Sequence, residues 1–109
     1  MDAQKQFEND VLFVLNNIKQ MLITKNRKYG DSALNPKQVF SNVDPIELIN
    51  VRIDDKLSRI ANKQQDEDED VEWDLLGYLI LKQIAKQRKV SSIKPNDVVF
   101  KTHTDRDLA

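Results

Sequence analysis

The sequence has no cysteine among its 109 residues, and this absence excludes several classes of protein. Without a thiolate, the chain has no disulfide framework, iron–sulfur cluster, thiolate zinc site or cysteine nucleophile. The single histidine, His103, excludes any site that requires two imidazoles. A chain of this kind suits a reducing compartment, so we expect a cytoplasmic protein.

Glycine and proline are scarce, with two and three residues, whereas charged residues make up 32% of the chain. Few backbone breakers and many charges are typical of helical proteins rather than of β-sandwiches. The formal net charge of −1 provides no strongly basic field, which argues against nucleic acid as the partner. The apolar runs are only a few residues long, so we expect no membrane span and no membrane partner.

Hydrophobic periodicity predicts three helices, at about 3–26, 44–63 and 68–88. Asp2 is placed to cap the first helix, whose apolar stripe consists of Phe7, Val11, Val14, Leu15, Ile18, Met21 and Leu22. The second helix begins at 44–47, a segment that combines an N-cap, a first-position proline and a capping-box acid. Its core stripe consists of Ile46, Ile49, Ile53, Leu57 and Ile60.

The third helix is apolar on most of its sides, as expected for a helix at the centre of a bundle or at a subunit interface. The sequence therefore predicts an all-α, three-helix antiparallel unit in residues 1–89, with two long helices and a broadly apolar third. We expect this unit to form a homo-oligomeric bundle, a dimer or larger. Residues 90–109 show no such periodicity, so we expect an irregular C-terminal tail there. In the loop 27–44, Asn35-Pro36 predicts a short helical turn to Phe40.

Charged residues are sorted on the second and third helices. Arg52, Lys56, Arg59 and Lys63 form a basic stripe along one side of the second helix, because they recur at helical spacing. On the third helix, Asp70 and Asp74 lie one turn apart, and Asp74 has apolar neighbours. Burial of an unpaired carboxylate costs several kcal/mol, so we expect a positive group to meet Asp74.

Two interpretations of these acids remain open. In the first, carboxylates from facing helices gather and bind Mg²⁺, which would bridge phosphate oxygens and orient a water molecule. The predicted metal ligands are Glu47, Asp54, Asp70 and Asp74. In the second, Asp74 forms an ion pair with Arg52, Arg59 or Lys28 and fixes the register of the helices without any chemistry.

Basic and aromatic residues suggest a site for a phosphorylated ligand. Residues 25–30 combine cations with a turn-forming glycine that permits close backbone approach, and aromatic rings stack on bases. The predicted ligand-binding residues are Lys25, Lys28, Tyr29, Arg52, Lys56, Arg59 and Tyr78. Each has a structural alternative: a solvated helix end, a solvated basic face, or an aromatic in the core.

Three segments resemble a known group of proteins: Lys28-Tyr29-Gly30-Asp31-Ser32, residues 52–60 (RIDDKLSRI) and residues 70–79 (DVEWDLLGYL). They resemble small phage proteins of the nucleotide-modification-associated type, which are similar to the MazG-like all-α nucleoside triphosphate pyrophosphohydrolases. The resemblance implies a nucleotide ligand and a Mg²⁺ cofactor. The chain departs from the MazG-like pattern at Val71, where the family has an acid, and at Lys56 and Arg59, where its acidic helix is dense.

The sequence thus supports three hypotheses. The first is a Mg²⁺-dependent pyrophosphohydrolase that acts on a nucleotide. The second is a non-catalytic protein that binds and sequesters a nucleotide or cyclic nucleotide, and the third is a structural oligomerisation module. The sequence does not decide whether the chain is an enzyme.

Overall fold

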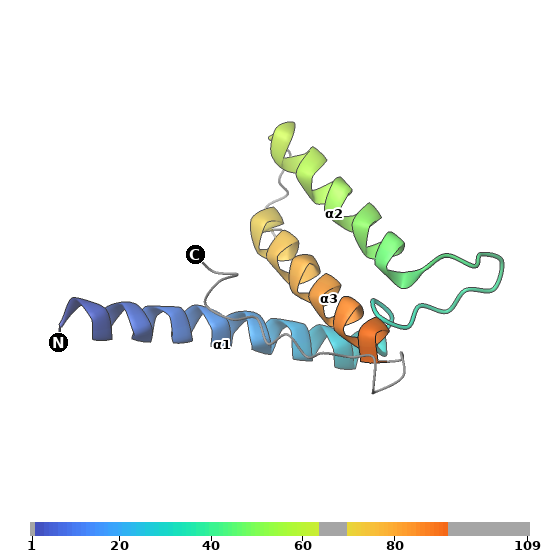
Figure 1. Cartoon of the computed structure of the whole chain (residues 1–109). Helices are drawn as coiled ribbons and strands as arrows, with labels where there is room; N and C mark the ends of the chain where they lie inside the picture. The colour runs from blue at the N-terminus through green and yellow to red at the C-terminus, as the bar shows by residue number, and fades with distance from the viewer. Residues whose placement is uncertain (1, 64–69, 92–109) are drawn as a thin grey trace.

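The computed structural model describes residues 2–63 and 70–91, and these form three α-helices (Figure 1). The helices are α1 (Ala3–Tyr29), α2 (Pro45–Ala61) and α3 (Val71–Ser91). No strand occurs in the described residues, so the predicted all-α class is confirmed. Within the same residues, no helix combines the length and the apolar character that crossing a lipid bilayer requires.

Local hydrogen bonds explain where α1 and α2 begin. The Asp2 carboxylate accepts the Lys5 N–H at 2.7 Å, and the Asp44 carboxylate accepts the Ile46 N–H at 2.9 Å. Each bond satisfies a donor that the first helical turn leaves without a partner, so both predicted N-caps are confirmed. At its other end, α1 continues three residues past the predicted boundary. Gly30 ends it by adopting the left-handed conformation, with φ of 64°.

The third helix begins at Val71, because the Asp70 carboxylate accepts the Trp73 N–H at 3.0 Å. It continues to Ser91 and therefore includes the first two residues of the predicted tail. The connection 64–69 and the tail from residue 92, with His103, lie outside the described residues.

The predicted helical turn at 36–40 is wrong, because the turn forms earlier, around Asp31. The Asp31 carbonyl accepts the N–H groups of Leu34 and Asn35, and its carboxylate accepts the side-chain amides of Asn26 and Asn35 at 2.6 Å. Asn35 thus closes this turn instead of capping a helix that starts at Pro36. The left-handed conformations of Gly30 and Asp31 make the tight turn possible.

Helices α2 and α3 form an antiparallel hairpin, and α1 crosses α3 near the C-terminal half of α1 (Figure 1). Leu34, Ile49 and Ile53 form the buried cluster of this hairpin, and partly buried residues of α3 pack against it: Leu75, Tyr78, Leu81, Ile84 and Ala85. Because α3 contacts both other helices, it is the central helix, as its broad apolar surface predicts.

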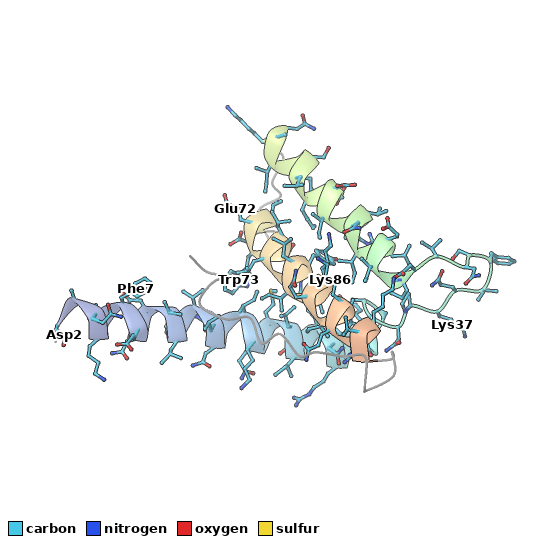
Figure 2. All side chains as sticks on the ribbon, viewed as in Figure 1. Asp2, Phe7, Lys37, Glu72, Trp73 and Lys86 are labelled. Atoms are coloured by element: carbon cyan, nitrogen blue, oxygen red, sulfur yellow. The ribbon has the colours of Figure 1, made fainter. Side chains whose placement is uncertain are left out.

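Parts of the predicted core stripes are exposed. On α1, Ile18 is buried, but the stripe residues nearer the N-terminus are exposed: Phe7, Val11, Val14 and Leu15. On α2, Ile49 and Ile53 are buried, whereas Leu57 and Ile60 are exposed. The reason on α1 is geometric, since its N-terminal half extends beyond α3 (Figure 2).

We predict that Gly77→Val separates α1 from α3. A Cβ atom at the buried Gly77 would lie 3.0 Å from Met21 Cε and 3.4 Å from Leu22 Cδ2, so larger side chains clash with α1. The expected loss is about 1–3 kcal/mol of unfolding free energy, measured by urea denaturation. Gln83→Val, at an exposed position of α3, is the control. Equal stability of the two variants would contradict the α1–α3 contact.

A second prediction concerns the pH dependence of the α2 cap. The Ile46 N–H and then the Lys89 ammonium, at 3.0 Å, lower the pKa of Asp44 below its ordinary value of 3.8. The cap therefore stabilises the fold above that value, and the contribution is lost as the pH falls through the lowered pKa. An NMR titration of the Asp44 carboxyl should show this pKa, and Lys89→Met should raise it in part.

Lys86→Met is the control for this titration, since it removes a charge from the same helix at an exposed position. An Asp44 pKa at or above 3.8 would show that the cap is absent in solution.

Candidate functional site

A pocket of about 370 Å³ lies where the three helices meet. It is bounded by the C-terminal half of α1, the turn at 31–33, one residue of α2 and the middle of α3. The lining residues are Met21, Leu22, Lys25, Asn26, Tyr29, Asp31, Ser32, Ala33, Lys56, Asp74, Gly77, Tyr78 and Leu81. Its size is at the lower end of the range for small-molecule sites, about 300–1,000 Å³.

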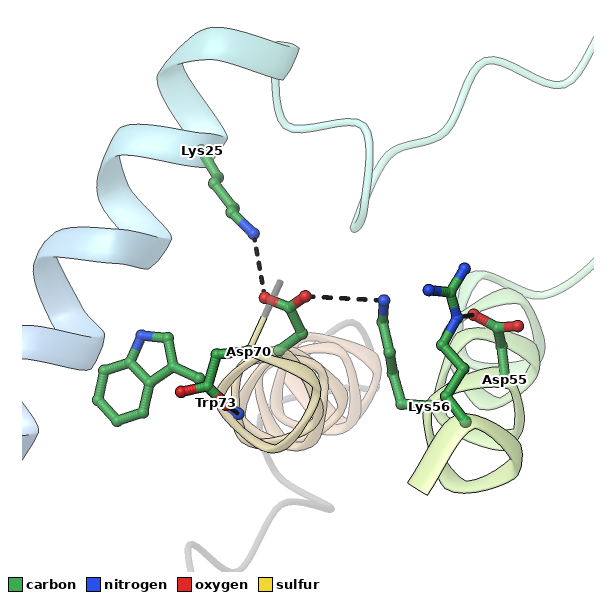
Figure 3. A network of polar contacts seen from close by, with 7 residues as sticks. Lys25, Asp55, Lys56, Asp70 and Trp73 are labelled. Atoms are coloured by element: carbon green, nitrogen blue, oxygen red, sulfur yellow. Dashed lines mark hydrogen bonds and ion pairs between the residues drawn. The ribbon is translucent and has the colours of Figure 1, made fainter. Parts of the chain in front are cut away.

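Asp74 lines this pocket and lies between two lysines from different helices, whose ion pairs are the dashed lines at Lys25 and Lys56 in Figure 3. Lys25 Nζ of α1 is 3.4 Å from Asp74 Oδ1, and Lys56 Nζ of α2 is 3.6 Å from Asp74 Oδ2. Each oxygen of the carboxylate therefore faces one ammonium group. This arrangement connects all three helices through a single side chain.

Helix periodicity explains why these three side chains converge. Lys25 follows Met21 by one turn, so it lies on the side of α1 that contacts Gly77. Lys56 is three residues after the buried Ile53 and is therefore beside the surface that α2 buries against α3. Asp74 precedes Gly77 by three residues and shares the side of α3 that α1 approaches.

The two lysines differ in exposure. The Lys56 side chain is 12% exposed and that of Asp74 is 20% exposed, whereas the Lys25 side chain is 53% exposed. The Lys56 ammonium is therefore held in place, and the Lys25 side chain remains accessible from solvent. Two ammonium groups thus face one carboxylate.

Asp31 forms another part of the pocket wall, and its negative charge is already balanced. Its carboxylate accepts hydrogen bonds from Asn26 and Asn35 and lies 3.8 Å from Arg88 Nη1. These bonds fix the turn that closes this side of the pocket.

Two tyrosines complete the wall with different surroundings. Tyr78 packs against the hairpin core, so its ring is held by its neighbours. Tyr29, at the end of α1, is exposed, and Lys28 Nζ lies 5.4 Å from its ring centroid. One face of the Tyr29 ring thus carries a cation–π contact.

The structure does not bring the four predicted metal ligands together. Glu47 is exposed and accepts a hydrogen bond from Asn50, Asp54 is exposed on α2, and Asp70 is occupied as the N-cap of α3. Across residues 2–63 and 70–91, no group of three or more acids and histidines is placed to hold a metal ion. Asp70 and Asp74 lie one turn apart on α3, but they do not form a metal site together. The Asp70 carboxylate instead accepts the Trp73 N–H as the N-cap of α3.

The predicted ligand-binding residues divide into two groups. Lys25, Tyr29, Lys56 and Tyr78 line the pocket together. Lys28, Arg52 and Arg59 do not belong to the lining, and Arg59 Nε instead lies 3.4 Å from Asp55 on its own helix. The expectation that a cation meets Asp74 is confirmed. The cations are Lys25 and Lys56, so the expected pairing with Arg52, Arg59 or Lys28 is wrong.

Sequence reasoning missed Asn26, Asp31 and Ser32 as pocket residues. The Tyr29-Gly30-Asp31-Ser32 segment does indicate a turn, but not that this turn folds back against α3. A signal was nevertheless present, since an aspartate after a helix-ending glycine is typical of a side chain that closes a turn.

Comparison with known proteins finds no matching family model, no similar curated protein and no similar solved structure. The resemblance to the MazG-like group therefore stays a hypothesis that the residues alone suggest.

We predict that Asp74 couples more strongly to Lys56 than to Lys25. In double-mutant cycles with Asp74→Asn, Lys56→Met should give a coupling of about 1–2 kcal/mol, because that pair is mostly buried, and Lys25→Met should give under about 1 kcal/mol. Urea denaturation measures both cycles, and Lys19→Met on α1 is the control. Equal couplings would mean that solvent screens the two pairs alike.

Proposed function

We propose that the protein binds a nucleotide in this pocket without a metal ion. The observation that carries the proposal is the pair of lysine ammonium groups that meet one carboxylate beside an exposed tyrosine. A phosphate group is the common biological ligand that combines multiple negative charge with several hydrogen-bond acceptors. Each lysine has three donors, so an ammonium group can contact Asp74 and a phosphate oxygen together.

The accessible cation of the pocket supports an anionic ligand. The Lys25 side chain is 53% exposed, and Arg88 lies beside the carboxylate of Asp31. The lysine contacts with Asp74, at 3.4 and 3.6 Å, are longer than the 2.7–2.9 Å of strong charge-assisted hydrogen bonds. A phosphate therefore competes against loosely held contacts.

The aromatic and apolar wall supports the nucleoside part of the ligand. Base stacking on an aromatic ring contributes about 1–3 kcal/mol and tolerates any base. Lys28 occupies the neighbourhood of one face of the Tyr29 ring, so a base would use the other face. Met21, Leu22 and Leu81 supply the apolar surface that a small-molecule site normally contains.

Magnesium, the cofactor that the resemblance implies, does not fit this donor set. Hard divalent cations require several oxygen ligands, and the pocket has two carboxylates. Asp74 and Asp31 each already lie beside a cation. Binding without catalysis is therefore the function that these residues support best, and hydrolysis has no comparable support from the geometry.

The test is calorimetric titration with a panel of nucleoside monophosphates, triphosphates and cyclic nucleotides, each with Mg²⁺ and with EDTA. We expect at least one nucleotide to bind equally well in EDTA and more tightly than inorganic phosphate. Lys25→Met should weaken this binding about tenfold, or about 1.4 kcal/mol, with little change in stability.

Lys19→Met provides the matched control, because it removes the same charge from an exposed position on the same helix. Failure of every nucleotide to bind would refute the proposal. Binding that requires Mg²⁺ and releases pyrophosphate would instead support the hydrolase hypothesis.

A further inference from the structure

The apolar stripe of α1 continues past the point where α3 covers it. Residues Met21 and Leu22 contact α3 at Gly77, and residues 7, 11, 14 and 15 lie on the same side of the helix at helical spacing. We call these four, Phe7, Val11, Val14 and Leu15, the arm stripe. Phe7 is 63% exposed and Leu15 is 53% exposed, and Figure 2 shows Phe7 on the part of α1 that extends beyond α3.

A second exposed apolar surface lies on the far side of the α2–α3 hairpin. Lys56 and Leu57 are three and four residues after the buried Ile53, so they lie on opposite sides of it. Gly77 and Leu79 likewise flank Tyr78, which packs on the hairpin core. Gly77 lies against α1, and Lys56 lines the pocket that α1 also lines, so Leu57 and Leu79 face away from α1. We call Leu57, Leu76 and Leu79, all exposed, the hairpin face.

Both apolar surfaces stay exposed in one chain, whereas five other apolar side chains of the described residues are buried: Ile18, Leu34, Ile49, Ile53 and Val71. Exposed apolar surfaces of this kind mark an interaction site. A second copy is the partner that is present wherever the chain is made.

We infer that the arm stripe of one copy packs on the hairpin face of a second copy, and the reverse, around a two-fold axis. In this arrangement the two hairpins lie side by side, with one α1 on each side of them. A self-complementary exchange of this kind closes and leaves neither surface exposed. The net charge of −1 produces no strong repulsion between copies.

The area is sufficient for a stable dimer. We take each of the four arm-stripe side chains to bury on the order of 100 Å² of its own accessible surface and as much of the partner's hairpin face. The two symmetric contacts then bury about 1,600 Å² in total, the standard size of a specific interface. This inference does not rest on the proposed nucleotide function, because none of the arm-stripe or hairpin-face residues lines the pocket.

The first test is the mass in solution, by sedimentation equilibrium of the full chain. The wild type should have twice the monomer mass of 12.7 kDa at micromolar concentration. Val14→Asp places a charge in the arm stripe and should weaken dimerisation at least a hundredfold. Asn16→Asp adds the same charge on the opposite side of α1 and should leave the dimer intact.

The second test does not depend on whether Val14→Asp folds. Because the chain has no cysteine, Leu15→Cys and Leu79→Cys can be introduced in separate copies and mixed. Oxidation should link the two copies in the mixture, and neither variant alone should form a disulfide dimer.

Three results would overturn the inference. The first is a wild type that remains monomeric at a concentration on the order of 100 µM. The second is a disulfide dimer of Leu15→Cys alone, since it would show that the arms pair with each other. The third is a monomer that dimerises only after removal of residues 92–109, because the C-terminal segment would then be the natural cover of the arm stripe.

Discussion

The ion pairs of the Asp74 carboxylate join all three helices of the described residues. Met21 and Leu22 of α1 lie against Gly77 of α3, and Lys25 adds an ion pair beside this apolar contact. Lys25 and Lys56 approach the two carboxylate oxygens from opposite sides. A partly buried acid is stable there because two cations replace part of its water.

The proposed binding site therefore uses residues that also join the helices. Lys25 is the cation that favours a ligand over a purely structural triad, because about half of its side chain is exposed. The Lys56 side chain is nearly covered and serves the fold, whereas Lys25 is half exposed and can move toward a bound anion. The pocket thus pairs a fixed cation with an adaptable one.

Much of the fold followed from the sequence, because caps and periodicity are local properties. Asp2 and Asp44 mark helix starts by chemistry that involves only their own first turns. The candidate site was harder to predict from the sequence, because periodicity assigns residues to one face of a helix but does not say which neighbouring element covers that face. Asp74 was correctly expected to meet a cation, yet the cations came from Lys25 and Lys56. Phe7 and Leu57 were expected in the core, because a stripe looks the same whether its own chain or another molecule covers it.

The order of the helices along the chain has a consequence for synthesis. Helix α1 emerges from the ribosome first, but its contact surface on α3 is made last, after a long connection and the whole of α2. The α2–α3 hairpin joins neighbouring segments and can form quickly, whereas docking of α1 must wait for a distant one. During translation the N-terminal helix therefore displays a bare hydrophobic strip of the kind that nascent-chain chaperones recognise.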